Sequence, residues 1–130
     1  MSPPARVLLD SCALMAPFQW GFNLDLELER LLGAPEISVP MGVLRELDRL
    51  SLSERDARSA RMLAGHYGTW TPGRVRDEDV SKLGSVDASL LEGGRDGWIV
   101  TTMDRPLIRK LVEEESQVIS LREKKRLEFI

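Results

Sequence analysis

Four acidic residues stand where a parallel α/β sheet would gather them into one crevice. They are Asp10, Glu46, Asp87 and Asp104. Asp10 and Asp104 each follow an apolar run with the length of a buried strand, and the ligand crevice of such sheets lies just beyond the carboxyl ends of the strands. Glu46 borders the apolar stripe of one expected helix, and Asp87 lies in the first turn of another. The sequence therefore predicts that the four carboxylates face one site.

Carboxylates that crowd together repel one another, and their pKa values rise unless cations neutralise them. Hard divalent cations take oxygen ligands, and the chain has one cysteine and one histidine, too few for a zinc site of that kind. We therefore expect Mg²⁺ or Mn²⁺, as a pair of ions that can activate a water and stabilise the leaving oxygen of a phosphodiester. Ser11 and Thr102 stand beside the acids and are expected to orient carboxylates or waters by hydrogen bonds.

The elements that would position these acids alternate along the chain. Strands are expected at 6–10, 36–39, 98–101 and 117–121, with a weak edge strand at 74–76. Helices are expected at 24–32, 41–50, 54–67, 86–93 and 106–115. Pro17 and Gly21 indicate a turn region after the first strand, and Gly93-Gly94 is expected to end a helix. This alternation predicts a three-layer α/β/α sandwich with a central parallel sheet.

Length and composition set the remaining limits. The 130 residues suit a single domain over 1–130, in which residues 122–130 form a basic C-terminal segment. No apolar stretch approaches the roughly 18–20 residues that a membrane helix needs, and the N-terminus lacks signal-peptide features, so we expect a cytoplasmic protein without a membrane partner. The net charge of −3 does not favour nucleic acid, but an acidic, cation-dependent site would shift the balance in the same direction.

The motifs around the acids resemble, as an ordered set, the PIN domain family of metal-dependent ribonucleases. The matching segments are LLDSCAL (8–14), VPMGVLREL (39–47), VDASLL (86–91) and VTTMDRPL (100–107). The resemblance covers nearly the whole chain, and it implies that Asp10, Glu46, Asp87 and Asp104 form the metal site. It also implies an endoribonuclease that leaves 5′-phosphate and 3′-hydroxyl ends, and a homodimer.

Three roles stay open within this resemblance. The ending over 118–127 is similar to that of archaeal-type single-domain members and of nucleases that process ribosomal RNA, which favours rRNA processing with a ribosome-assembly partner. The alternative within the same class is a VapC-type toxin whose antitoxin partner blocks the crevice. A different class is a catalytically weak RNA-binding or assembly module, because Cys12 and Met103 stand where the family often has Asn.

Basic residues elsewhere in the chain supply candidate RNA contacts. They are Arg55, Arg58 and Arg61 on one expected helix, Arg105 after the last acid, and Lys124, Lys125 and Arg126 near the C-terminus. Each group is either a solvated surface or a contact for RNA phosphates. Phe18 and Trp20 are expected in the core, with a dimer interface or base stacking as alternatives.

Two other acid-based families fit the chain less well. A phospho-acceptor receiver domain needs paired acids after its first strand, but Ser11 and Cys12 follow Asp10. A phosphatase of the Asp-x-Asp type needs its second acid where Cys12 stands. We expect Cys12 to be a small buried residue and not a nucleophile.

Overall fold

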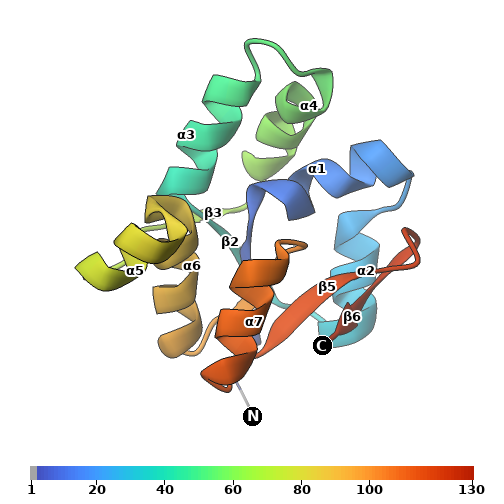
Figure 1. Cartoon of the computed structure of the whole chain (residues 1–130). Coiled ribbons are helices and arrows are strands. Elements are labelled where there is room, and N and C mark those ends of the chain that lie inside the picture. Colours follow the sequence, from blue (N-terminus) through green and yellow to red (C-terminus); the bar gives the residue numbers. More distant parts are fainter. Residues whose placement is uncertain (1–2) are drawn as a thin grey trace.

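A mostly parallel sheet forms the centre of the molecule. The computed structural model (Figure 1) describes residues 3–130, and within them a sheet of six strands has the order β3-β2-β1-β4-β5-β6. The strands are β1 (Arg6–Leu9), β2 (Glu36–Pro40), β3 (Gly68–Trp70), β4 (Ile99–Thr101), β5 (Val118–Arg122) and β6 (Arg126–Phe129). Strands β1 to β5 pair in parallel, and β6 pairs antiparallel with β5 at one edge.

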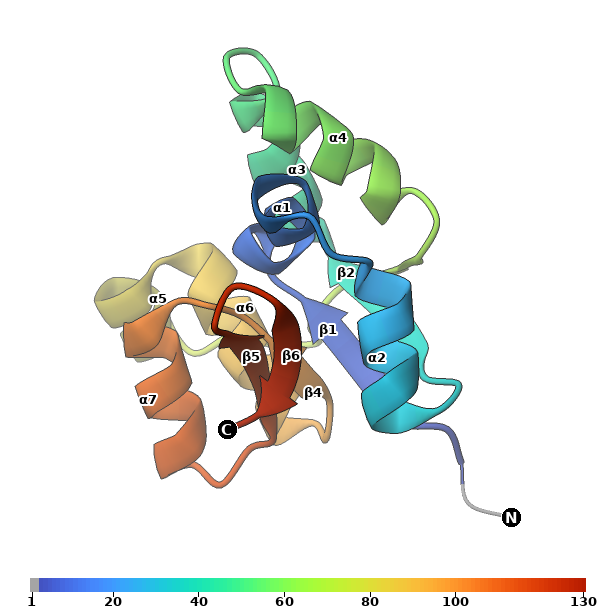
Figure 2. The ribbon, with the colours of Figure 1, turned by 90° about the vertical axis from the view of Figure 1, so that its right-hand side faces the viewer.

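Helices cover both faces of this sheet. They are α1 (Ser11–Trp20), α2 (Leu24–Leu32), α3 (Met41–Leu50), α4 (Arg55–Ala64), α5 (Asp77–Leu83), α6 (Ser85–Arg95) and α7 (Arg105–Glu113). Alternation along β1 separates two cores: Val7 and Leu9 pack with α1 to α4, whereas Leu8 packs with α6 and α7. Figure 2 shows these two groups of helices on either side of β1. The predicted α/β/α sandwich is therefore confirmed. No helix in residues 3–130 is long and apolar enough to cross a membrane.

Helix α1 occupies the stretch where the sequence predicts a turn region. The Asp10 carboxylate accepts a hydrogen bond from the Ser11 backbone N–H at 2.8 Å and begins the helix, and Gly21, at φ 73°, ends it. Pro17 lies inside the helix and removes one backbone donor. Residues 13–17 are all buried and α1 packs against α4, so tertiary burial outweighs the local penalty of the proline.

The two edges of the sheet differ from expectation. The prediction of an edge strand at 74–76 is wrong, because the edge strand is β3. At the start of β3, Gly68 allows close pairing with β2, since a Cβ there would lie 2.8 Å from Ser38 Oγ. The sequence patterns predict neither α5 nor β6. The basic segment 122–130 instead holds a hairpin turn and β6, with Leu127 buried in the core. These short elements are stabilised by their neighbours and carry little periodicity of their own.

Helix α6 continues to Arg95, past the Gly93-Gly94 pair at which the sequence predicts its end. A Cβ on Gly93 would collide with Leu8 Cδ1 on β1, and a Cβ on Gly94 would lie 2.8 Å from Leu111 Cδ2 on α7. The glycine pair therefore allows α6 to pack closely against both elements. Because α6 carries Asp87 in its first turn, this close packing also sets how near Asp87 lies to the end of β1.

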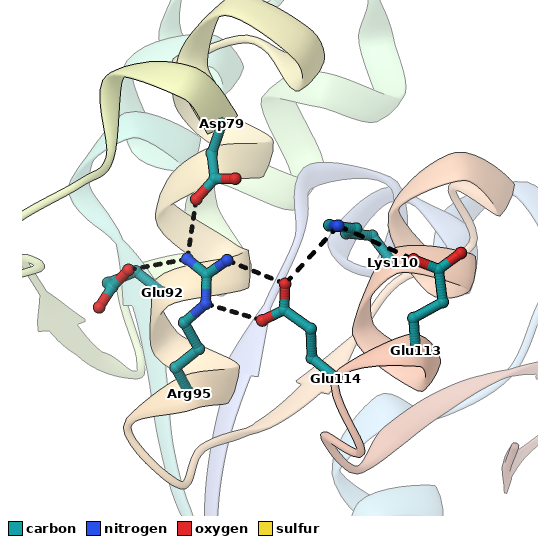
Figure 3. A network of polar contacts seen from close by, with 6 residues as sticks. All are labelled: Asp79, Glu92, Arg95, Lys110, Glu113 and Glu114. Atoms are coloured by element: carbon teal, nitrogen blue, oxygen red, sulfur yellow. Dashed lines mark hydrogen bonds and ion pairs between the residues drawn. The ribbon is translucent and has the colours of Figure 1, made fainter.

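A network centred on Arg95 fixes α5 and α7 against α6 (Figure 3). Arg95 donates hydrogen bonds to Asp79 on α5 at 2.8 Å and to Glu92 on α6 at 3.0 Å. Two of its guanidinium nitrogens also contact Glu114, just after α7, at 2.7 and 2.9 Å. The Arg95 guanidinium holds the pKa of the Asp79 carboxyl below its usual value. The network thereby anchors the segment that leads through Gly84 into α6.

We predict that Gly93→Ala destabilises the fold by about 1–2 kcal/mol, because moving the fully buried Leu8 outweighs the helix propensity gained. Gly73→Ala is the matched control, since a Cβ there meets nothing within 4 Å. Urea denaturation followed by circular dichroism measures both. Equal stability of the two variants would show that α6 can move away from β1 at no loss.

We predict that Arg95→Met costs about 2–3 kcal/mol at pH 7, since it leaves the Asp79 carboxylate buried without a cation. The Asp79 pKa is lowered in the fold, so the pair stabilises fully above the usual value of 3.8 and its contribution disappears as the pH falls below it. Denaturation at pH 7 and pH 3 should therefore show a smaller acid sensitivity in the variant. Arg122→Met removes an exposed ion pair with Glu128 and should change stability by less than about 0.5 kcal/mol.

Candidate active site

A pocket of about 560 Å³ at the carboxyl ends of β1 and β4 is lined by all four predicted acids. Asp10 directly follows β1, Glu46 lies on α3, Asp87 lies in the first turn of α6, and Asp104 follows β4. Because β1 and β4 are parallel neighbours, the residues after them emerge at the same edge of the sheet. The fold thus brings one carboxylate from each of four separate segments into one pocket.

Asp10 is the most firmly held of these acids. Its carboxylate is buried and accepts hydrogen bonds from the Ser11 N–H at 2.8 Å, the Thr102 hydroxyl at 2.7 Å and the Cys12 thiol at 3.4 Å. Burial raises the pKa of Asp10 above its usual value, and these three donors act in the opposite direction. The side chain is thus fixed in one orientation with its charge only partly compensated.

Thr102 connects Asp10 with the segment that carries Asp104. Its buried hydroxyl donates to Asp10 and accepts a hydrogen bond from the Asp104 backbone N–H at 3.1 Å. Asp104 in turn caps α7, since one carboxylate oxygen accepts from the Leu107 N–H at 2.9 Å. Asp104 therefore caps α7 and lines the pocket at the same time.

The two positions that depart from the family pattern are part of the same network. The Cys12 sulfur accepts a hydrogen bond from the Met103 backbone N–H at 3.3 Å while its S–H donates to Asp10. Burial, and then the charge of Asp10, raise the pKa of Cys12 to about 12, so the thiol stays protonated near neutral pH. Beside it, the Ser11 hydroxyl donates to a Glu46 carboxylate oxygen. Cys12 is therefore a hydrogen-bonding link and not a nucleophile.

Asp87 is a pocket acid whose pKa is strongly raised by its surroundings. No side chain within residues 3–130 donates a hydrogen bond to its carboxylate, which is half-buried. Burial, and then the charges of Asp10, Asp104 and Glu46, raise the pKa of Asp87 to about 7. The pocket therefore holds more negative charge than its own residues neutralise.

Sequence reasoning missed Arg49, which also lines the pocket. Arg49 lies three residues after Glu46 on α3, so helical spacing from an acid already assigned to the site could have identified it. It is the basic residue among the described residues that line the pocket. Gly84 and Ser85, where α5 meets α6, also form part of the wall.

The basic residues predicted to contact RNA fall into separate places. Arg58 donates to the Ser51 backbone carbonyl at 3.1 Å and Arg61 to Asp48 at 2.8 Å, so both hold α4 against the end of α3. They and Arg55 lie outside the residues that line the acid pocket.

The other predicted basic residues lie at the start of α7 and around the β5–β6 turn. Arg105 and Lys124 line a second groove, and Lys125 and Arg126 are exposed. The expectation that Phe18 and Trp20 lie in the core is wrong, because they are 44% and 46% exposed. Both stand in the last turn of α1, where the helix runs out beyond the core.

The donor set of the pocket fits a hard divalent cation. Carboxylate oxygens are the ligands that Mg²⁺ and Mn²⁺ take, and a cation would offset both the burial and the repulsion that raise the pKa of Asp87. Among residues 3–130, no three acidic, histidine or cysteine side chains stand close enough to hold one ion between them. Mg²⁺ usually keeps several waters and binds through one or two carboxylates, so it does not require three protein ligands around one ion.

We predict that Asp87→Asn stabilises the metal-free protein at pH 8 by about 1 kcal/mol, a rise of roughly 3–5 °C in Tm, after allowing for solvent screening. The pKa of Asp87 rises from 3.8 to about 7 in the fold, so its ionisation destabilises the fold as the pH increases through that window. The gain should therefore vanish below pH 4. Thermal unfolding in a chelator at pH 4 and pH 8 measures it, and an equal gain at both values would contradict the assignment.

Comparison with known proteins gives the family. A sequence model of the PIN-like domain matches residues 7–124. The structure of the PIN domain endonuclease Utp24 superposes with a TM-score of 0.76, over 98% of this chain and 93% of that chain, at 18% sequence identity. Identity at this level shows a shared fold, and no curated protein matches the chain by sequence. Since the family match covers nearly all of the 130 residues, the chain belongs to the PIN-like domain family.

Proposed function

We propose that this protein is a Mg²⁺- or Mn²⁺-dependent endoribonuclease that hydrolyses RNA phosphodiester bonds in the acid pocket. The observation that carries the proposal is the convergence of Asp10, Glu46, Asp87 and Asp104 from four segments on one pocket, with the pKa of Asp87 raised to about 7. Structural ion pairs would neutralise such a cluster, whereas this one keeps an excess of negative charge. Membership of the PIN-like domain family supports the nuclease reading.

In this proposal Asp10 and Asp87 are the principal metal-holding residues, and Glu46 and Asp104 complete the set. When bound, divalent ions activate water for attack on phosphorus and stabilise the charge of the leaving oxygen. The residues around the acids hold them in place. Thr102 orients Asp10, and Ser11 orients Glu46 by hydrogen bonds.

Arg49 has a complementary role in this proposal. As a cation at the edge of the acid pocket, it is placed to contact a phosphate of the bound strand and to offset the repulsion between RNA and the four acids. Such a contact would position the backbone without reading its sequence. The pocket thus offers both the groups for the chemistry and one group that attracts the substrate.

We assign the biological role to RNA processing, with rRNA processing and a ribosome-assembly partner favoured by the resemblance of residues 118–127. The VapC-type toxin role with an antitoxin partner, and the homodimer, stay predictions from the same resemblance. A toxin should arrest growth on expression and be relieved by its antitoxin, whereas a processing nuclease should leave growth unaffected.

We predict that the protein cleaves labelled RNA with Mg²⁺ or Mn²⁺, and that Asp10→Asn and Asp87→Asn each lower the rate at least about 100-fold. Gel electrophoresis of the products at matched protein concentration measures the effect. Asp48→Asn is the control, since Asp48 lies on α3 near Glu46 but its carboxylate pairs with Arg61 outside the pocket.

Three outcomes separate the alternatives. Cleavage that persists in Asp10→Asn, or in a chelator, would contradict the metal-dependent mechanism. RNA binding without cleavage, unchanged by loss of the acids, would favour the RNA-binding or assembly module. Metal-dependent cleavage by the wild type and by Asp48→Asn, together with its loss in Asp10→Asn and Asp87→Asn, would support the nuclease.

A further inference from the structure

We propose that a second groove beside the acid pocket binds single-stranded RNA that extends from the site of cleavage. This groove has a volume of about 650 Å³ and lies between the end of α1, the start of α7 and the β5–β6 turn. We call it the hairpin groove, and its residues that matter here are Trp20, Met103, Arg105, Arg109, Glu123 and Lys124. The inference rests on the proposed function, because it assigns the path of the RNA that the acid pocket would cut.

The hairpin groove is adjacent to the acid pocket. Met103 lines both, and it stands between Thr102, which holds Asp10, and Asp104. Arg105, the residue after Asp104, already belongs to the groove. A strand that leaves the acids therefore needs only to pass Met103 to reach it.

The charge of the hairpin groove suits a polyanion. Arg105, Arg109 and Lys124 are its cations, with Glu123 as its acid. These three cations are largely exposed and make no ion pair among residues 3–130, whereas Arg122 and Arg126 on the same hairpin both pair with Glu128. Cations without a protein partner are available to phosphates, so the groove carries a net positive charge, in contrast to the acid pocket, where Arg49 stands against four carboxylates.

Trp20 gives the groove a surface on which a base can stack. Its side chain is 46% exposed at the end of α1, and the Lys124 ammonium lies 4.5 Å from the ring centroid. Exposed aromatic rings interleaved with cations are the usual means of binding single strands without sequence preference. The cation–π contact also holds Lys124 inside the groove, near the path of the backbone.

The backbone of the hairpin turn supports a functional role for Lys124. Glu123 and Lys124 have φ values of 55° and 59°, and the Lys125 N–H closes the turn on the Arg122 carbonyl at 3.2 Å. Turns in which both central residues have positive φ favour Asn and Gly there, because most other side chains are strained by their Cβ. Strain of this kind concentrates where the side chains serve a purpose. Here the strained residues are the two that line the groove.

This strain gives a discriminating variant, Lys124→Gly. It should keep or raise the Tm, because glycine adopts the positive φ of this position freely, yet weaken RNA binding because it removes the Lys124 cation. If Lys124 had only a structural role, the variant should have a lower Tm and an unchanged affinity for RNA. Trp20→Ala should weaken binding by about 5- to 150-fold, the range for loss of one stacked base, and Trp20→Phe should retain most of it.

The experiment uses the full chain with Asp87→Asn, which stops cleavage and is expected to fold. Fluorescence anisotropy of a labelled 12-nucleotide single-stranded RNA measures affinity in about 50 mM salt, where phosphate contacts are strong. Arg105→Gln with Arg109→Gln should weaken binding and flatten its salt dependence by roughly 0.7 per lost contact. Arg74→Gln, an exposed arginine outside both sites, should stay within about twofold.

The outcomes separate this inference from the proposed function. Selective loss of affinity in the groove variants supports the groove even if the wild type cuts nothing. Unchanged affinity in those variants, or no RNA binding by the Asp87→Asn protein, overturns the groove even if the wild type cleaves RNA, and would point to a protein as its occupant.

Discussion

Mutual repulsion between four carboxylates is the constraint on which this structure depends. Negative charges placed at one edge of a sheet tend to drive their segments apart, and after burial, which is the larger cause, this repulsion contributes to the raised pKa of Asp87. The fold resists it by fixing each segment independently. Asp10 and Asp104 are held by the helices that they cap, and α6 is held against β1 by close packing at Gly93. The pocket is thus a high-energy feature kept in place by ordinary packing around it.

The Arg95 network shows how far from the pocket that support extends. Arg95 lies at the end of α6 remote from Asp87, and it joins α5, α6 and α7 through buried or partly buried carboxylates. It places positive charge where acids need neutralising for stability, while the pocket acids stay without such partners. Carboxylates are therefore paired with a cation around Arg95 and left without one in the pocket. This difference distinguishes acids that stabilise the fold from acids that are kept for a ligand.

The central elements could be predicted from sequence because their signals are local. Strands β1 and β4 are marked by short apolar runs, and helices α3 and α7 by apolar residues at helical spacing. In each of these segments no other pattern is as strong. The missed elements depend on contacts between distant residues. Helix α1 forms despite Pro17 because residues 13–17 are buried, and β3 and β6 are three or four residues long and gain order by pairing with a neighbour.

The same division applies to the candidate site. The four acids could be identified because each stands at a strand end or helix start that the sequence marks. Arg49 could not be found by type alone, since arginines at surface positions are common and only its spacing from Glu46 distinguishes it. The hydrogen bond that Cys12 accepts from the Met103 backbone could not be predicted either, because it joins two segments separated by 91 positions. Residue type thus reveals which groups can do chemistry, and only the fold reveals which groups hold them.

The net charge of −3 conceals an uneven distribution that matters for function. The four pocket acids lie on one side of Met103, and Arg105, Arg109 and Lys124 lie on the other, so the average charge predicts no affinity for RNA. A nuclease of this kind needs both signs close together, because the groups that hold cations repel the substrate that the cations must reach. Under the function proposed for this protein, Met103 separates the groove that attracts the RNA from the pocket that cuts it, which would resolve that conflict: the strand would bind where the surface is positive and pass Met103 into the acid pocket.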